Sequence, residues 1–141
     1  MGSMQGRYGF ELEIRKPEEQ LDLARAALYI AQEERPDLDP EAYLRRLDRM
    51  AAEIYERLPA ERYPLRIVRT INSYLFDCLK FRGNTEDYYD PRNSFLDEVL
   101  TRRCGIPIAL SLVYIEVARR LQFPMVGIGL PGHFLIRPNL E

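Results

Sequence analysis

Apolar residues recur every three or four positions in the first half of the chain, which is the spacing of a helix with one buried face. Such runs follow Pro17, Asp39-Pro40 and Pro64, and proline fits the first turn of a helix. The pattern predicts three amphipathic helices, of which the first ends before Pro36. Their apolar positions are Leu21, Ala24, Leu28 and Ala31; Leu44, Leu47, Ala51, Ile54 and Leu58; and Leu65, Val68, Ile71, Leu75 and Leu79.

Residues 108–121 are apolar on almost every side, unlike the three preceding helices. Asn93 or Ser94 can cap a short helix that reaches about Arg103, and Gly105 breaks it before Pro107. A helix without a broad polar face usually lies at the centre of a domain. We therefore expect a buried helix that begins at Pro107.

Toward the C-terminus the chain changes from helical to strand-like spacing. Residues 125–130 and 133–136 are rich in apolar and β-branched residues and are separated by Pro131-Gly132, which predicts two strands of a hairpin or meander. A two-stranded sheet is marginal on its own, so we also expect the natural chain to continue beyond Asn139. The fold class predicted is α+β, with a mostly helical core, a central buried helix and the start of an antiparallel sheet.

Composition excludes several classes of protein. The 141 residues are 46% hydrophobic and 30% charged, which suits one soluble globular domain. Residues 1–3 and 140–141 resemble vector sequence, so the expected domain covers residues 4–139. Twenty Lys and Arg against 22 Asp and Glu give a net charge of -2, without a basic field for nucleic acid or anionic membranes. No apolar run approaches a membrane span, and we expect neither a nucleic-acid nor a membrane partner.

Only two cysteines, Cys78 and Cys104, and one histidine, His133, are present. These side chains cannot build a multi-ligand Cys/His metal site, and no metal or cofactor is expected. Few cysteines and the absence of a leader-like N-terminus fit a reducing cytoplasm. Cys78 shares a predicted helix face with Ile71 and Tyr74, so core packing is its expected role.

The candidate chemistry lies at the start of the apolar helix. Cys104 precedes the helix N-terminus, where partial positive charge and the neighbouring Arg102 and Arg103 favour the thiolate. His133, on a neighbouring strand, can take the proton, as in papain-like acyl-transfer enzymes. The simpler interpretation is that Cys104 is a turn residue and that His133 is a strand residue bonded to a backbone carbonyl. The charged positions Arg45, Arg46 and Arg49 are most simply a solvated helix face.

Four blocks of sequence resemble one known family in the same order. They are residues 23–34, 89–96, 105–114 and 129–137. Together they are similar to the bacterial SirB-type proteins, the second transglutaminase-like core family, which also occurs in a eukaryotic F-box protein. The resemblance runs from about Glu18 to Arg137 and implies a papain-like, transglutaminase-like fold. A helical repeat region follows in many members, which agrees with a chain truncated at its C-terminus.

The resemblance also bears on catalysis. In active transglutaminase-like cores the nucleophilic cysteine begins the central helix, and matching residues 118–124 to the end of that helix puts Pro107 at the nucleophile's position. Cys104 lies about one helical turn earlier, a displacement that exceeds catalytic tolerance. His133 matches the family's strand histidine, and the third member of a triad would lie beyond Asn139.

Two function classes remain open from the sequence. The favoured one is a catalytically degenerate module that binds a protein or peptide in a groove beside His133 and the Pro131-Gly132 turn. The alternative is a thiol acyl-transfer enzyme of the protease, amidase or transamidase type, with Cys104 as nucleophile and His133 as base. A third, weaker hypothesis is support of a downstream repeat region or a homo-oligomer.

Overall fold

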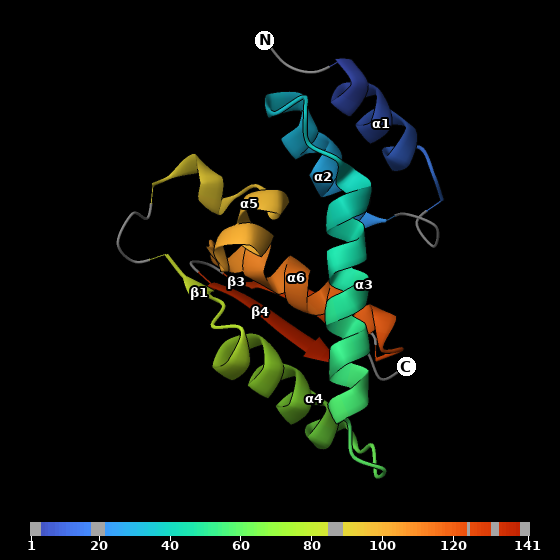
Figure 1. The fold of residues 1–141 in the computed structure, drawn as a ribbon, viewed down its shortest axis with the longest axis vertical. Coiled ribbons are helices and arrows are strands. Elements are labelled where there is room, and N and C mark those ends of the chain that lie inside the picture. Colours follow the sequence, from blue (N-terminus) through green and yellow to red (C-terminus); the bar gives the residue numbers. More distant parts are fainter. Residues whose placement is uncertain (1–3, 18–21, 85–88, 124, 131–132, 139–141) are drawn as a thin grey trace.

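A helical body with a β-hairpin against one side makes up the structure, a computed structural model of the chain (Figure 1). The structure describes all residues except 1–3, 18–21, 85–88, 124, 131–132 and 139–141. For the two strands of the hairpin it describes the course of the backbone.

The described elements are four α-helices followed by shorter helices and strands, the long helix α6 and two further strands. In chain order they are α1 (Met4–Ile14), α2 (Leu23–Glu34), α3 (Pro40–Arg57), α4 (Pro64–Asn72), the π-helix η2 (Ser73–Cys78), β1 (Arg82–Gly83), the 3-10 helix η3 (Pro91–Asn93), α5 (Leu96–Arg102), β2 (Cys104–Gly105), α6 (Pro107–Arg120), β3 (Met125–Leu130) and β4 (His133–Pro138). β1 pairs with β2 in parallel, and β3 pairs with β4 antiparallel. The mostly helical architecture and the C-terminal hairpin predicted from the sequence are confirmed.

Proline and aspartate set the starts of several helices. The predicted starts at Pro40, Pro64 and Pro107 are confirmed, and the Asp39 side chain caps α3 by accepting a hydrogen bond from the backbone N–H of Glu41 at 3.1 Å. The predicted start at Pro17 is wrong. α2 begins only at Leu23, because the carboxylate of the preceding aspartate accepts the backbone N–H of Arg25 and so caps the helix there.

α1 is a helix that the sequence pattern did not predict. Its apolar side chains point in several directions, and Leu12 and Ile14 remain exposed. Close packing on α2 depends instead on Gly6 and Gly9. A Cβ atom at Gly6 would lie 2.6 Å from the backbone nitrogen of Glu33, and one at Gly9 would lie 2.6 Å from the ring of Tyr29. Gly6 therefore allows α1 to approach the backbone of α2, and Gly9 leaves room for the Tyr29 ring.

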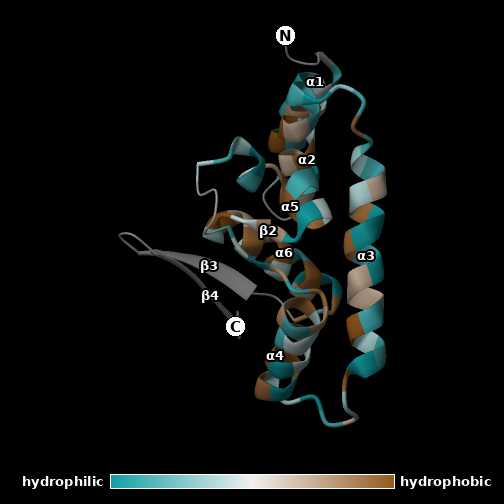
Figure 2. Ribbon diagram, turned by 60° about the vertical axis from the view of Figure 1, so that its left-hand side comes forward, coloured by the Kyte–Doolittle hydropathy of each residue, from teal (hydrophilic) through white to brown (hydrophobic). Residues whose placement is uncertain are grey.

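α6 lies at the centre of the molecule, as the sequence predicted. Both α3 and the β3–β4 hairpin contact it, and Figure 2 shows α3 next to it. Val117 and Ala118 are completely buried and Val113 nearly so, whereas Ile108 in the first turn is 56% exposed. The core around α6 collects fully buried side chains from the other helices, among them Leu28, Leu47, Ile54, Ile71 and Val99.

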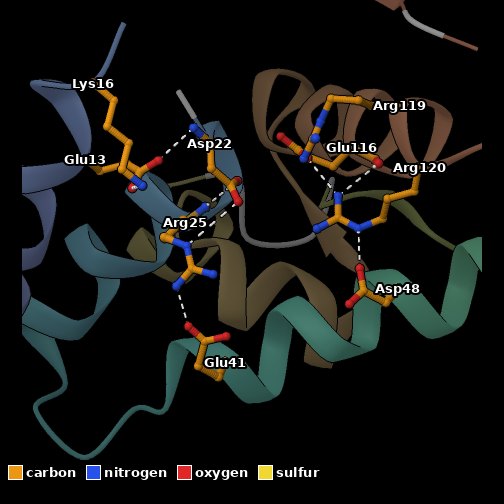
Figure 3. A network of polar contacts seen from close by, with 9 residues as sticks. All are labelled: Glu13, Lys16, Asp22, Arg25, Glu41, Asp48, Glu116, Arg119 and Arg120. Carbon is orange, nitrogen blue, oxygen red and sulfur yellow. Dashed lines mark hydrogen bonds and ion pairs between the residues drawn. The ribbon is translucent and has the colours of Figure 1, made fainter. Parts of the chain in front are cut away.

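A buried carboxylate ties α6 to α3 (Figure 3). Glu116 is only 2% exposed, and its Oε2 accepts hydrogen bonds from Arg119 at 2.6 Å and from Arg120 at 2.8 Å. Arg120 also donates through Nε to Asp48 of α3 at 2.7 Å. A buried charge is tolerated when it is paired and hydrogen-bonded in this way, so this polar side chain on an apolar helix has a structural explanation.

A second network joins the N-terminal helices (Figure 3). The buried carboxylate of Glu13 accepts the backbone N–H of Asp22 at 2.8 Å and pairs with Lys16 at 2.7 Å. Arg25, in the first turn of α2, pairs with Glu41 at the start of α3. These contacts link α1 to the residue that caps α2, and α2 to the start of α3.

The expected core role of Cys78 is wrong, because its side chain is exposed. α4 continues into a π-helix, in which the N–H of Leu79 bonds to the carbonyl of Tyr74 five residues earlier, at 2.9 Å. A π-turn holds more residues than an α-turn, so the later residues rotate away from the predicted face. Tyr74 and Leu75 stay buried, and Cys78 faces Arg57, which donates to its Sγ at 3.4 Å.

Candidate functional site

Short segments of backbone hold the start of α6. Arg82 of β1 pairs with Cys104 of β2, and the N–H of Ile106 bonds to the carbonyl of Asn93 at 3.0 Å. The Asn93 side chain is buried and accepts a hydrogen bond from Asn84 at 2.9 Å. The α6 N-terminus is thereby anchored to two loops that are distant in sequence.

Pro107 occupies the first turn of α6, with Ile106 as its N-cap. Pro107 is exposed, whereas Cys104 lies outside the helix in β2 and is 4% exposed. Within the described part of the chain, no hydrogen bond or ion pair involves the Cys104 thiol. Pro107 therefore lies in the helix, and the buried Cys104 thiol belongs to the short strand that precedes it.

His133 is the first residue of β4, and its backbone pairs with Leu130 of β3. Both strands contact α6, so this strand runs beside the central helix as expected. The His133 side chain, the Pro131-Gly132 turn and any group beyond Asn139 lie outside what the structure describes. A reactive pair of Cys104 and His133 therefore stays a prediction.

An apolar groove opens at the start of α6. It has a volume of about 380 Å³ and lies between α2, α5 and the exposed side of α6. Its lining side chains are Leu23, Ala27, Ser94, Leu96, Ile108, Ala109, Leu112 and Ile115. None of them carries a charge, and Leu23 and Ile108 are each more than half exposed at its edge.

Asp90 was predicted to be part of a solvated loop, although a sequence signal for a capping role exists. Its carboxylate accepts the backbone N–H of Arg92 at 3.0 Å and caps η3, and it lies 3.7 Å from the guanidinium of Arg102. Hydrogen bonds from the side chain and backbone of Arg92 lower the pKa of Asp90 to about 2. The sequence Asp90-Pro91 repeats the Asp39-Pro40 pattern that marks the start of α3, and it marks a cap here too.

Among the residues that the structure describes, no cluster of three or more His, Cys, Asp or Glu side chains is arranged to hold a metal ion. No helix in the same residues combines the length and the apolar composition that crossing a bilayer requires.

Comparison with known proteins gives the family. The sequence profile described as the transglutaminase-like superfamily matches residues 41–141. A UPF0162 protein of Xylella fastidiosa is 45% identical over 125 residues, which are 85% of this chain and 43% of the relative. A UPF0162 protein of Pseudomonas aeruginosa is 38% identical over 120 residues, 82% of this chain and 42% of the relative.

A eukaryotic relative shares a shorter segment. F-box only protein 21 of Mus musculus is 49% identical over 71 residues, which are 50% of this chain and 11% of that protein. The chain spans less than half the length of the bacterial relatives described above. No solved structure matches it significantly. The profile covers well over half of the chain, and the chain therefore belongs to the transglutaminase-like superfamily and has UPF0162 homologues in bacteria.

Proposed function

We propose that this domain is a non-catalytic member of its superfamily that binds an apolar segment of a partner protein or peptide in the groove at the start of α6. The observation that carries the proposal is the arrangement of Pro107 and Cys104. Pro107, which has no nucleophilic atom, stands in the first turn of the central helix, and the nearest thiol is buried in β2. We also propose that the domain is of the SirB type, as the four sequence blocks suggest.

Burial of the thiol weighs against acyl transfer. A nucleophilic cysteine has to reach the substrate carbonyl as a thiolate, and reactive cysteines are at least partly exposed and electropositive in their surroundings. Cys104 is 4% exposed and sits before the helix instead of on it. Catalysis by Cys104 and His133 would therefore need a rearrangement of β2 as well as a suitable histidine position.

The groove supports a specific kind of ligand. A charged ligand group would lose water there without gaining a partner, because no charged side chain lines the groove. Aliphatic or aromatic side chains would instead cover Leu23 and Ile108, which are exposed in the free domain. The occupant proposed is therefore an uncharged apolar stretch of a partner chain, with Ser94 as a polar contact at the edge.

The greater length of the relatives supports a role for this domain as one module of a larger protein. The matched segment is 11% of F-box only protein 21, so most of that protein lies outside the shared region. A domain that recurs within much longer chains suits a binding role, in which the surrounding segments supply other activities.

A matched pair of exposed positions tests the groove. Ile108 and Leu65 each follow a first-turn proline and are 56% and 61% exposed, but only Ile108 lines the groove. We expect peptides selected from a random library on the unmodified chain to carry adjacent apolar residues. Ile108→Glu should weaken their binding by about tenfold or more, because the carboxylate has no partner in the groove. Leu65→Glu should leave it unchanged.

Titration by fluorescence anisotropy measures the dissociation constants of the selected peptides for the three proteins. Circular dichroism spectra verify that each variant is folded. Selection of no peptide, or equal weakening by both substitutions, would contradict binding in this groove.

A further inference from the structure

A second pocket, separate from the apolar groove, lies beside the middle of α3. It has a volume of about 510 Å³ and is lined by α3, the π-helix with the residues after it, and the end of α5. Three arginines, Arg46, Arg49 and Arg103, line it. The sequence-based interpretation of Arg46 and Arg49 as a simple solvated face omits this pocket, because its other walls come from distant parts of the chain.

Two of the three guanidinium groups form hydrogen bonds within the protein, and the third can bind a ligand with all its donors. Arg46 donates to the hydroxyl of Thr101 at 3.2 Å, and Arg103 donates to the carbonyl of Leu79 at 3.3 Å. Each guanidinium has five N–H donors, so single bonds leave most of this capacity for a ligand. Arg49 makes no hydrogen bond or ion pair with any residue that the structure describes.

One carboxylate, that of Glu53, also lines the pocket. It accepts a hydrogen bond from the Tyr74 hydroxyl and forms no ion pair with Arg49, one helical turn away. Burial and this bond raise the pKa of Tyr74 to about 12, so the phenol remains a neutral donor at neutral pH. The charged lining side chains thus leave an excess of two positive charges, which matches a phosphate monoester with close to two negative charges.

Part of the pocket lining is apolar. Phe81 and Leu100 are 6% and 5% exposed, and Met50 and Leu79 also line the pocket. Apolar lining side chains contribute binding energy only to a ligand with an apolar body. The combination of arginines and apolar side chains therefore suits an amphipathic anion better than a bare inorganic ion.

Unusual backbone geometry brings this pocket together. Arg103 has a φ of 58° at the C-terminal cap of α5, a conformation that glycine adopts more easily. Tyr74 lies in the π-helix, a form that is frequent at functional sites. Conformations of this kind cost free energy and persist where the surrounding structure stabilises them. Here the two unusual conformations place the side chains of Arg103 and Tyr74 at the pocket.

We propose that this pocket binds a small organic phosphate monoester, with the phosphate on Arg46, Arg49 and Arg103 and an apolar or aromatic body on Phe81, Leu100 and Met50. Arginine forms paired hydrogen bonds with phosphate oxygens, and its fixed charge persists at all physiological pH values. The inference does not depend on the peptide-binding function proposed for the groove.

Titration calorimetry with phenyl phosphate on the full chain, at physiological salt, tests this assignment. Phenyl phosphate should bind saturably and more tightly than either inorganic phosphate or benzoate, and phenol should not bind. Arg49→Ala should weaken phenyl phosphate binding by about tenfold, the effect of one charge-assisted hydrogen bond. Glu53→Gln should strengthen it, because it removes the negative charge beside the phosphate.

Arg45→Ala is the matched control. Arg45 lies on the same helix, is exposed, and pairs only weakly with Asp39 at 3.9 Å, away from the pocket lining. This variant should bind phenyl phosphate like the unmodified chain. The proposal is overturned if phenyl phosphate shows no saturable binding, if Arg49→Ala binds normally, or if Arg45→Ala loses as much affinity as Arg49→Ala. Preference for benzoate would overturn the assignment to phosphate.

Discussion

Replacing Val117 by glutamate should destabilise the folded domain by about 4 kcal/mol or more, a large part of the stability of an ordinary domain. Val117 is completely buried in α6, the helix that contacts both α3 and the hairpin. A carboxylate at this position would lose its water without gaining a partner, and a larger side chain would also have to fit into a filled core. Urea unfolding followed by circular dichroism measures the change.

The same helix offers the control for this prediction. Ile108→Glu introduces the same charge on α6 at a position that is 56% exposed, and it should change stability by no more than about 0.5 kcal/mol. Position 108 lies in the first turn of α6, where the positive end of the helix dipole stabilises an acidic side chain. A Val117→Glu protein as stable as Ile108→Glu would contradict a central position for α6.

Replacing Gly105 by alanine should cost about 2–3 kcal/mol, since overpacking at a tight site has costs of this size. An added Cβ would lie 2.7 Å from Cγ2 of Val99, which is itself completely buried, and 2.9 Å from the carbonyl oxygen of Asn93. That carbonyl accepts the N–H of Ile106, so it cannot move without weakening the anchor of α6. The measurement is again the free energy of unfolding in urea.

Gly83 is the natural control, because it is the residue paired with Gly105 across β1 and β2. A Cβ added to Gly83 meets no atom within 4 Å. Gly83→Ala should therefore leave stability nearly unchanged or raise it slightly by restricting the unfolded chain. Equal losses for the two alanine variants would show that the close approach at Gly105 does not determine stability.

The helical body was largely predictable because its signals are local. Prolines and capping residues mark the starts of α3, α4 and α6, and the lack of a polar face on residues 108–121 indicates their central position. α5 begins later than predicted, at Leu96, because η3 occupies the residues before it. Both predicted capping residues belong to η3, in which Asn93 is the last residue and Ser94 the C-terminal cap.

Features that depend on contacts between distant segments were not predictable. α1 packs through Gly6 and Gly9, and glycines without apolar periodicity predict no helix. The π-helix turned Cys78 outward, since the prediction assumed an unbroken α-helical period. The pairing of Arg82 with Cys104 joins strands of two residues each, too short for any pattern.

The candidate site, too, was predictable where its signals are local and not where they depend on packing. The start of the helix at Pro107, with Cys104 ahead of it, could be predicted from the proline and the family resemblance, because both are sequence properties. Burial of the Cys104 thiol could not, since it depends on how β1, β2 and α6 pack together. Likewise, Arg49 looks like an ordinary solvated residue until α5 and the π-helix are placed beside it.

Alkylation of Cys104 by iodoacetamide tests most directly whether the domain lacks a catalytic thiol. Cys78→Ala first removes the exposed cysteine, so that only Cys104 reacts. The rate constant is then measured for the native and the urea-unfolded protein, each with and without His133→Ala. Mass spectrometry of the intact chain follows the modification.

Native Cys104 should react at least about 100-fold more slowly than the unfolded thiol, because reaction has to wait for local opening of β2. The His133→Ala substitution should leave the native rate unchanged. A native thiol that reacts faster than the unfolded one, and that slows when His133 is removed, would contradict the non-catalytic assignment.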